Sequence, residues 1–244
     1  MTKSTKETST DNVITIASLN LWRFNDWENR LPNIVKVLRE LSPDIILLQE
    51  AQLNKRIDHR NQIEILNTEL GYPFSTFQVA EIKTTRKGIP LGYSVDHGLG
   101  VLSRISFAPE VIKLTKADDG KEQRILLKCT FDANGTPYTI TNLHFSNSDI
   151  GAENHFKETL DILNKGKIKS ILVGDFNIFD MSKYRDLYGD KYQASSDLYE
   201  YVSYPEDNAS LDYILLPHGY EFQDFFCLDV PISDHKMIVS KIKL

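Results

Sequence analysis

The sequence predicts an α/β fold of the α+β kind: a four-layer sandwich of two packed mixed β-sheets flanked by helices. Two observations lead to this class. Strand-like segments are many, and segments with a helical apolar face are few. These segments also lack the regular alternation of strand and helix that a doubly wound parallel sheet requires. Since 244 residues are an ordinary length for one such domain, we expect a single compact unit.

The first half of the chain is predicted to contain both strands and long helices. We expect strands at Val13–Leu19, Ile45–Leu48, Phe74–Val79 and Leu99–Ser103, and helices at Trp27–Leu41 and Asp58–Leu70. The first helix carries its apolar residues on one face and is stopped by Pro43, and Gly71 stops the second. The run Ile45–Leu48 is apolar throughout, as in a strand buried on both faces, so it presents Gln49 and Glu50 at its end.

The second half of the chain consists mainly of strands. We expect them at Arg124–Phe131, Tyr138–His144, Ile171–Val173, Leu211–Leu216, Glu221–Leu228 and Met237–Lys243. The dipeptide Asn134-Gly135 predicts a tight hairpin turn between the first two. Phe156, Leu160 and Leu163 share one helical face ahead of the third. Strands therefore dominate this half as well, which favours two packed sheets.

The N-terminal segment and the cysteines indicate the protein's surroundings. Residues 1–11 are rich in Lys, Ser, Thr and Glu, so we expect a disordered tail before a domain at 12–244. The chain as given shows neither a signal peptide nor an apolar segment that could span a membrane, which predicts a cytoplasmic protein; a secreted form whose signal had been trimmed stays open. Cys129 and Cys227 lie in apolar runs and are expected to be buried free thiols.

The charge balance bears on the partners. Lys and Arg number 28 against 34 Asp and Glu, and the net charge of −6 gives no overall attraction for polyanions. This argues against a tight nucleic-acid binder but not against a nuclease, because a carboxylate metal site adds acidic residues of its own. The basic run Lys83–Gly88 is interpreted either as a solvated loop or as a contact for a polyphosphate or strand backbone. Zinc-finger, P-loop and serine-hydrolase motifs are absent from the sequence.

Polar residues gather where the predicted strands end. They are Asn20, Glu50, His144, Asp175, Asn177, Asp212, Asp234 and His235. Each alone is typical of a turn or a helix cap. Together, carboxylates, carboxamides and imidazoles are the groups that hold a hard cation such as Mg²⁺ and the oxygens of a phosphate. Strand ends at one edge of a sheet sandwich can bring such groups together.

The same segments resemble, in their order, those of the endonuclease/exonuclease/phosphatase superfamily. They are Ser18-Leu19-Asn20, Leu47-Leu48-Gln49-Glu50, Gly98 to Arg104, Asn142-Leu143-His144, Gly174-Asp175-Phe176-Asn177, Leu211-Asp212-Tyr213-Ile214 and Ser233-Asp234-His235. That group includes pancreatic-type deoxyribonucleases, AP endonucleases, deadenylases, inositol-polyphosphate 5-phosphatases and neutral sphingomyelinases. The resemblance extends from about Val13 to Leu244.

The resemblance implies a metal site and a catalytic set. Glu50 would be the principal ligand of Mg²⁺ or Mn²⁺, with Asn20 beside it and Asp234 on the far side. Asp175 would orient or deprotonate the attacking water, although His235 is the other candidate for the base. The remaining implied roles are phosphate binding by Asn177, orientation of His235 by Asp212, phosphate donation or acid catalysis by His144, and a nearby phosphate contact from Arg124.

The family pattern is incomplete around the second histidine. His144 lacks the expected carboxylate partner upstream in any convincing motif, and only Glu81 and Asp96 are candidates, which weakens the case for a mechanism with two carboxylate–histidine pairs. The remaining histidines show no repeated ligand spacing, and we expect them at the surface or in loops; they are His59, His97, His155 and His218.

These features predict a divalent-metal-dependent phosphoesterase that hydrolyses P–O bonds. We expect a phosphodiesterase acting on nucleic acid. The alternative is a phosphatase or a phospholipase-type esterase acting on a small or lipid phosphate. A catalytically inactive binding module fits less well, because binding alone does not require this set of polar residues. We expect a monomer whose partner is the phosphate-ester substrate.

Overall fold

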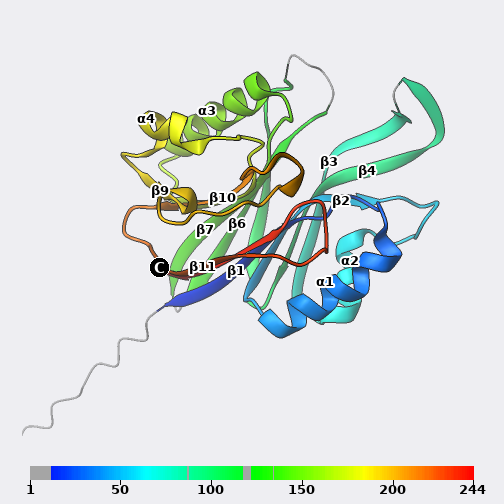
Figure 1. The fold of residues 1–244 in the computed structure, drawn as a ribbon, viewed down its shortest axis with the longest axis horizontal. Coiled ribbons are helices and arrows are strands. Elements are labelled where there is room, and N and C mark those ends of the chain that lie inside the picture. Colours follow the sequence, from blue (N-terminus) through cyan, green and yellow to red (C-terminus); the bar gives the residue numbers. More distant parts are fainter. Residues whose placement is uncertain (1–11, 87, 118–121, 134) are drawn as a thin grey trace, which may run out of the picture.

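The computed structural model of the protein describes residues 12–244 except residues 87, 118–121 and 134. Two six-stranded mixed sheets pack face to face in this part of the chain, with helices on both outer sides (Figure 1). The predicted fold class is therefore confirmed. The predicted tail at residues 1–11 and Asn134 of the predicted hairpin turn lie outside the described residues.

One sheet contains the first and the last strands of the chain. Its order is β11-β12-β1-β2-β4-β3. The strands are β1 (Val13–Asn20), β2 (Ile45–Leu53), β3 (Phe74–Arg86), β4 (Ile89–Ser103), β11 (Glu221–Leu228) and β12 (Met237–Lys243). Strand β1 pairs parallel with β2 and antiparallel with β12. Helices α1 (Trp27–Leu41) and α2 (Gln62–Leu70) cover its outer face (Figure 1).

The second sheet has the order β5-β6-β7-β8-β10-β9. Its strands are β5 (Phe107–Lys113), β6 (Ile125–Ala133), β7 (Thr136–His144), β8 (Ser170–Asp175), β9 (Tyr192–Ala194) and β10 (Asp212–Pro217). Strands β7 and β8 are parallel, so their carboxyl ends, at His144 and Asp175, lie side by side. Helix α3 (Asp149–Lys165) and the short α4 (Arg185–Tyr188) lie on the outer side (Figure 1).

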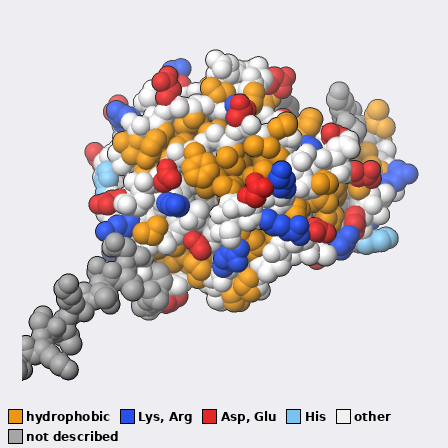
Figure 2. Space-filling model, turned by 60° about the horizontal axis from the view of Figure 1, so that its bottom comes forward, with side chains coloured by type: hydrophobic (Ala, Val, Ile, Leu, Met, Phe, Trp, Pro, Cys, Tyr) orange, Lys and Arg blue, Asp and Glu red, His pale blue; other side chains and the backbone are white. Residues whose placement is uncertain are grey.

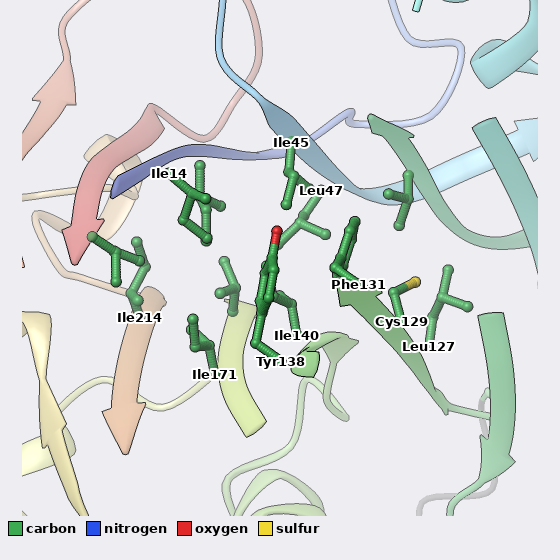
Figure 3. Close-up of a cluster of buried hydrophobic side chains, with 14 of the residues drawn as sticks. Ile14, Ile45, Leu47, Leu127, Cys129, Phe131, Tyr138, Ile140, Ile171 and Ile214 are labelled. Carbon is green, nitrogen blue, oxygen red and sulfur yellow. The ribbon is translucent and has the colours of Figure 1, made fainter. Parts of the chain in front are cut away.

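The core between the sheets follows from the alternation of side chains along each strand. Figure 3 shows side chains from β1 and β2 facing side chains from the second sheet; it labels Ile14, Ile45, Leu47, Leu127, Cys129, Phe131, Tyr138, Ile140, Ile171 and Ile214. The alternate residues of β1, such as Ala17 and Leu19, pack instead beneath α1 and α2. On the other side, the predicted helical face of Phe156, Leu160 and Leu163 packs against the second sheet.

Several strands are longer than the sequence predicts. Strand β2 continues past Leu48 to Leu53, because a register shift between Leu48 and Ala51 inserts Gln49 and Glu50 without ending the strand. Strands β3 and β4 form a long hairpin that projects from the body (Figure 1). Lys83 therefore lies in a strand and not in a loop.

Other sequence expectations are also corrected. Helix α2 begins at Gln62 and not at Asp58, because a capping box fixes its start. The Asn61 side chain accepts a hydrogen bond from the Glu64 N–H, and the Glu64 carboxylate accepts one from the Asn61 N–H. Strands β5 and β9 were not predicted. His97 and His155 are buried and not at the surface.

Cys129 and Cys227 are free thiols, and only the first is fully buried. Acidic and basic side chains are interspersed with apolar ones over the face shown in Figure 2. Within the described part of the chain, every helix is too short or too polar to cross a membrane.

Candidate active site

Most of the predicted site residues meet where the same ends of the two sheets come together. Asn20 ends β1 in one sheet, and its side-chain N–H donates to Oδ2 of Asp175, which ends β8 in the other, at 3.0 Å. Asp175 is flanked in register by His144 on β7 and Asp212 on β10. All four side chains are buried. The parallel pair β7 and β8 thus places the polar residues of the second sheet beside the end of β1.

Asp212 and His235 form a hydrogen-bonded pair. Nδ1 of His235 lies 2.8 Å from Oδ2 of Asp212, so the ring donates to the carboxylate. The ring of Tyr204 packs against His235 with ring centres 4.8 Å apart. Burial would lower the pKa of His235, but the charges of Asp212 and Asp175 outweigh burial and raise this pKa to about 10. The contact expected between the two residues is present, and His235 is held in its charged form.

Asp175 lies between the two imidazoles. Its Oδ2 is 3.4 Å from Nε2 of His144 and 3.8 Å from Nε2 of His235. Its Oδ1 accepts the backbone N–H of Asn177 at 2.9 Å. Burial raises the pKa of Asp175 to about 7, although the positive charge of His235 opposes the rise. A carboxylate with a pKa near neutrality can accept a proton from water at physiological pH.

Asn177 is placed by an unusual backbone conformation. Its φ of 50° is in the left-handed region, which asparagine tolerates better than most residues. The turn directs its side-chain N–H to the carbonyl of Phe145 at 3.2 Å. One amide hydrogen remains to donate to a bound phosphate, which is the role expected from the sequence.

His144 receives a hydrogen bond from Arg124. The guanidinium Nη1 lies 2.8 Å from Nδ1 of His144. Because a guanidinium can only donate, Nδ1 must accept, and the proton of the ring is therefore on Nε2, which faces Asp175. Burial and the charge of Arg124 lower the pKa of His144 well below its usual value. His144 is a neutral donor in this arrangement.

The carboxylate partner of His144 that the family pattern suggested is replaced here. Arg124 occupies Nδ1, while Glu81 lies 3.9 Å from Lys116 and Asp96 pairs in register with Leu53 and Ile82 along β4. Nδ1 of His235 is thus paired with a carboxylate, and Nδ1 of His144 is paired with a guanidinium.

The other two predicted metal ligands are Asp234, which Ser233 links to Asn20, and Glu50, whose charge acts on Asp234. Ser233 Oγ donates to the carbonyl oxygen of Asn20 at 2.6 Å and lies 3.0 Å from Asp234 Oδ1, which ties Asp234 to the end of β1. Burial raises the pKa of Asp234, and the negative charge of Glu50 adds to this rise although His235 opposes it. Glu50 has a φ of 52° at the bulge of β2, and its Oε1 accepts from Arg23 at 2.9 Å.

These residues fit a divalent cation. The negative charge of Glu50 raises the pKa of Asp234, and a bound cation would offset that repulsion. The side-chain oxygen of Asn20 already accepts the Trp22 N–H at 3.0 Å but keeps a second lone pair. Oxygen donors of this kind are those that Mg²⁺ and Mn²⁺ prefer.

A second group of side chains could also bind a metal. Asp175, Asp212 and His235 offer ligand atoms that all lie within 4.8 Å of one another, and all three residues are buried. This cluster differs from the predicted ligand set. Its His235 nitrogen Nδ1 is already committed to Asp212, and Oδ1 of Asp212 has no hydrogen-bond partner among the described residues.

Sequence reasoning missed several residues of the site. Gln49 and Asn142 are fully buried, and the Gln49 side-chain N–H donates to Asn142 Oδ1 at 2.8 Å between the two sheets. A polar residue two positions before His144, on the same face of an apolar strand, was a usable signal for Asn142. Arg23 and Glu122 belong to no motif in the sequence, and only the tertiary fold brings them to the site.

The chain was compared with known proteins. A family model described as the Endonuclease/Exonuclease/phosphatase family matches residues 17–235. No curated protein sequence matches the chain. The endonuclease/exonuclease/phosphatase structure from Beutenbergia cavernae is similar, with 18% identity, 95% of this chain and 72% of that chain covered, and a TM-score of 0.76.

Two further similar structures carry more specific names. The human nocturnin catalytic domain with a bound sulfate anion shares 18% identity over 94% of this chain and 93% of that chain, with a TM-score of 0.68. A Bacteroides thetaiotaomicron mannosyl-6-phosphatase shares 17% identity over 95% of this chain and 100% of that chain, also with a TM-score of 0.68. At such identities these structures show that the fold is shared.

Proposed function

The chain belongs to the endonuclease/exonuclease/phosphatase family, whose members hydrolyse phosphoesters, and from this premise we propose that it is a phosphodiesterase that uses Mg²⁺ or Mn²⁺ and acts on nucleic acid. One observation carries the proposal. Asn20, His144 and His235 all face the same oxygen of Asp175, so a hydrogen-bond acceptor, two imidazole nitrogens and a carboxamide converge on one point. A structural role alone would not require this convergence.

Different side chains would have different roles in the in-line attack of water on the phosphate. Asp175, which accepts hydrogen bonds from Asn20 and the Asn177 N–H, would accept the proton of the attacking water. His235, kept protonated by Asp212, would hold a phosphoryl oxygen by a charged hydrogen bond. The Nε2–H of neutral His144 and the free amide hydrogen of Asn177 are the further donors.

Glu50, Asp234 and the amide oxygen of Asn20 would hold the divalent cation. When bound there, the cation supplies neutralisation of charge on the phosphoryl group and on the departing oxygen. Arg23 now occupies one oxygen of Glu50 and would share that carboxylate or move aside.

A phosphatase acting on a small phosphate is the second candidate. The net charge of −6 gives no general attraction for a nucleic acid, and a protein of the same fold is named a mannosyl-6-phosphatase. The two candidates differ in whether the scissile phosphate is a diester or a monoester.

An assay of Glu50→Gln tests the proposal. Substrates would be bis-p-nitrophenyl phosphate, p-nitrophenyl phosphate, plasmid DNA, RNA, inositol phosphates and sphingomyelin, each with Mg²⁺, Mn²⁺ or EDTA. We expect EDTA to abolish turnover and Glu50→Gln to reduce it by on the order of a hundredfold or more, because a bound metal supplies several kcal/mol of charge stabilisation. The matched control is Glu110→Gln. Glu110 lies outside the site, and its carboxylate Oε2 pairs with Lys128 Nζ at 2.6 Å.

The outcomes separate the parts of the proposal. Full activity in excess EDTA would exclude the metal mechanism. Unchanged metal affinity in Glu50→Gln would exclude only the ligand assignment. Turnover of the monoester alone would favour the phosphatase, and hydrolysis of bis-p-nitrophenyl phosphate with DNA or RNA supports the nuclease.

A further inference from the structure

One carboxylate beside the site lies among nitrogen-bearing side chains from both sheets. Glu122 is in the segment just before β6. Its neighbours are Arg23 after β1, Lys83 on β3, His97 on β4, and Arg124. The proposed chemistry does not use Glu122, Lys83 or His97.

Both oxygens of Glu122 face positive groups. Oε1 contacts Lys83 Nζ and lies 3.6 Å from Nη2 of Arg23. Oε2 lies 3.3 Å from Nη2 of Arg124 and 3.6 Å from Nδ1 of His97. Burial would raise the pKa of Glu122, but the positive charges around it outweigh burial and lower this pKa to about 2. Glu122 is therefore a fixed anion at any physiological pH.

One carboxylate does not satisfy the cluster. Nε of Arg23, Nε of Arg124, Nε2 of His97 and Oε2 of Glu122 are buried and have no hydrogen-bond partner among the described residues. Buried polar atoms without partners are rare in folded proteins. Arg124 and His97 are only 6% and 3% exposed, so bulk water does not supply the missing hydrogen-bond partners. As it lies here, Glu122 therefore leaves the Nε–H groups of Arg23 and Arg124 without an acceptor, and its own Oε2 has no hydrogen-bond donor.

The charges are also unequal. Arg23, Lys83 and Arg124 are three cations, and Glu122 is one anion. Glu50 shares Arg23 at 2.9 Å, and its carboxylate is assigned to the metal in the proposed mechanism. A phosphate group brings up to two negative charges and three acceptor oxygens, which matches three cations with free N–H groups better than a single carboxylate does.

The cluster adjoins the place where the scissile phosphate would bind. Arg124 joins it to His144 at 2.8 Å, and Arg23 joins it to Glu50 at 2.9 Å. His97, Arg124 and His144 line one small cavity. An anion bound here would therefore be a neighbour of the scissile phosphate on the same substrate.

We propose that Arg23, Lys83, Arg124 and His97 form a subsite for a second phosphate group of the substrate, next to the phosphate that is cleaved, and that Glu122 occupies this subsite in the free protein. The inference rests on the proposed function for the identity of the neighbouring site. The substrate is then a compound with two nearby phosphates, as in a nucleotide strand or a bisphosphorylated small molecule. Glu122 precedes the first β6 pair, Ile125 with Lys113, so its side chain can turn away without breaking a ladder.

A binding experiment without metal or turnover tests the subsite. Inorganic phosphate would be titrated into the protein in EDTA by calorimetry. Removing the competing carboxylate in Glu122→Gln should strengthen phosphate binding by about tenfold or more, since roughly 1.4 kcal/mol corresponds to that factor. The control Glu110→Gln removes the same charge from a lysine pair elsewhere and should change nothing.

A second variant locates the effect. Adding Lys83→Met to Glu122→Gln should remove most of the gain, because Lys83 contacts Glu122 directly. Unchanged phosphate affinity in Glu122→Gln, with the fold intact by circular dichroism, overturns the proposal. So does a gain that persists when Lys83 is replaced. If Glu122→Gln does not fold, Lys83→Met alone should weaken phosphate binding relative to wild type, and wild-type affinity in it overturns the proposal.

A kinetic experiment distinguishes the two sources of the second phosphate. One substrate pair is thymidine 3′-(p-nitrophenyl phosphate) with and without a 5′-phosphate. The other is glucose 1-phosphate and glucose 1,6-bisphosphate. We expect kcat/KM to favour the member with two phosphates by about tenfold or more in at least one pair, and Lys83→Met to bring that ratio toward one through KM. Equal kcat/KM within both pairs contradicts the proposal.

The two arms keep this proposal separate from the proposed function. If the protein hydrolyses none of these esters, the calorimetric arm still tests the subsite. If the protein is a metal-dependent phosphoesterase without a second-phosphate subsite, Glu50→Gln loses activity while Glu122→Gln leaves phosphate binding unchanged.

Discussion

His144 and His235 differ in the charge of the group that each ring contacts. The partner of His235 is a carboxylate, which stabilises a charged ring, and the partner of His144 is a guanidinium, which stabilises a neutral one. The site therefore contains one imidazolium and one neutral imidazole at neutral pH. Two histidines with different partners can perform different tasks toward the same phosphate.

The neutral state of His144 can be measured. We expect nitrogen-15 NMR to show the neutral Nε2–H form of this ring at neutral pH in the metal-free protein. Arg124→Met should raise the pKa of His144, because it removes a cation 2.8 Å from the ring, while Arg124→Lys, which keeps the charge, should raise it less. An imidazolium signal from His144 in the wild type at pH 6 to 7 would contradict the assigned tautomer.

The raised pKa of His235 gives a second prediction. Asp212→Asn should lower this pKa from about 10, because it removes the closest carboxylate, and should lower turnover as well. A group whose pKa is raised on folding stabilises the protein below its unfolded pKa of about 6.5, and the stabilisation is lost as pH rises through about 10.

Chemical denaturation at several pH values checks the sign of this effect. Between pH 6.5 and 10, the free energy of unfolding of the metal-free wild type should fall more steeply than that of Asp212→Asn. Parallel curves for the two proteins, or an unshifted His235 titration in the variant, would show that Asp212 does not control the ring.

Single residues also show the reach of sequence reasoning. The pairing of Asp212 with His235 could be expected from motifs at strand ends, whereas Asn20 was expected beside Glu50 and its side-chain N–H donates to Asp175. The neighbours of Arg124 could not be expected, because a charged residue at the start of a strand gives no information about what faces it. His97 was misplaced for the same reason: a lone polar residue in a strand carries no sign of which face is buried.

At the scale of elements, the close approach of β7 and β8 sets the site. Gly174 has a φ of 142°, and a Cβ there would lie 2.1 Å from the carbonyl oxygen of Leu143. Glycine is thus required for the two strands to pair with His144 opposite Asp175.

Gly174→Ala should therefore lower both stability and activity. Gly92→Ala is the matched control, since Gly92 also has a positive φ, 71°, but a Cβ there would meet nothing within 4 Å. We expect the control to lose only about 1–2 kcal/mol, the cost of a left-handed backbone, and Gly174→Ala to lose more. Equal losses in thermal unfolding would mean that the close approach of the strands does not matter.

Element types were easier to predict than element ends. Helix α1 and strands β11 and β12 have the predicted bounds because their apolar patterns end at clear breaks. Strand β2 did not end where its apolar run ended, since the bulge at Gln49 and Glu50 preserves pairing across polar residues. The outer halves of β3 and β4 pair mainly with each other, so no buried face marks them in the sequence.

At the scale of the whole molecule, the two sheets share one core. Side chains of both sheets form a single buried cluster between them (Figure 3). The buried Asn142 adds a polar contact, because its side-chain N–H groups donate to the carbonyls of Leu48 and Gly100 at 3.2 and 3.0 Å in the other sheet. Neither sheet can keep these contacts when the other unfolds.

We therefore expect one cooperative unfolding transition for the metal-free protein. Circular dichroism and tryptophan fluorescence should give coincident curves in urea, and light scattering should give a monomer at micromolar concentration. Asn142→Leu should lower the midpoint of this transition, since it removes the acceptor of one Gln49 N–H and the donors to the carbonyls of Leu48 and Gly100 in the core. Two separate transitions would show that the sheets are independent units.

The pairing of β1 with β12 has a consequence for synthesis on the ribosome. Strand β1 needs Met237–Lys243 as its neighbour, and these residues are translated more than 200 positions after it. At roughly 5–20 residues per second, the edge of β1 that pairs with β12 stays unpaired for on the order of tens of seconds. An unpaired strand edge makes a chain prone to aggregation during that time. His235 is translated only two residues before β12, so the nascent chain has no assembled active site until this segment has been translated.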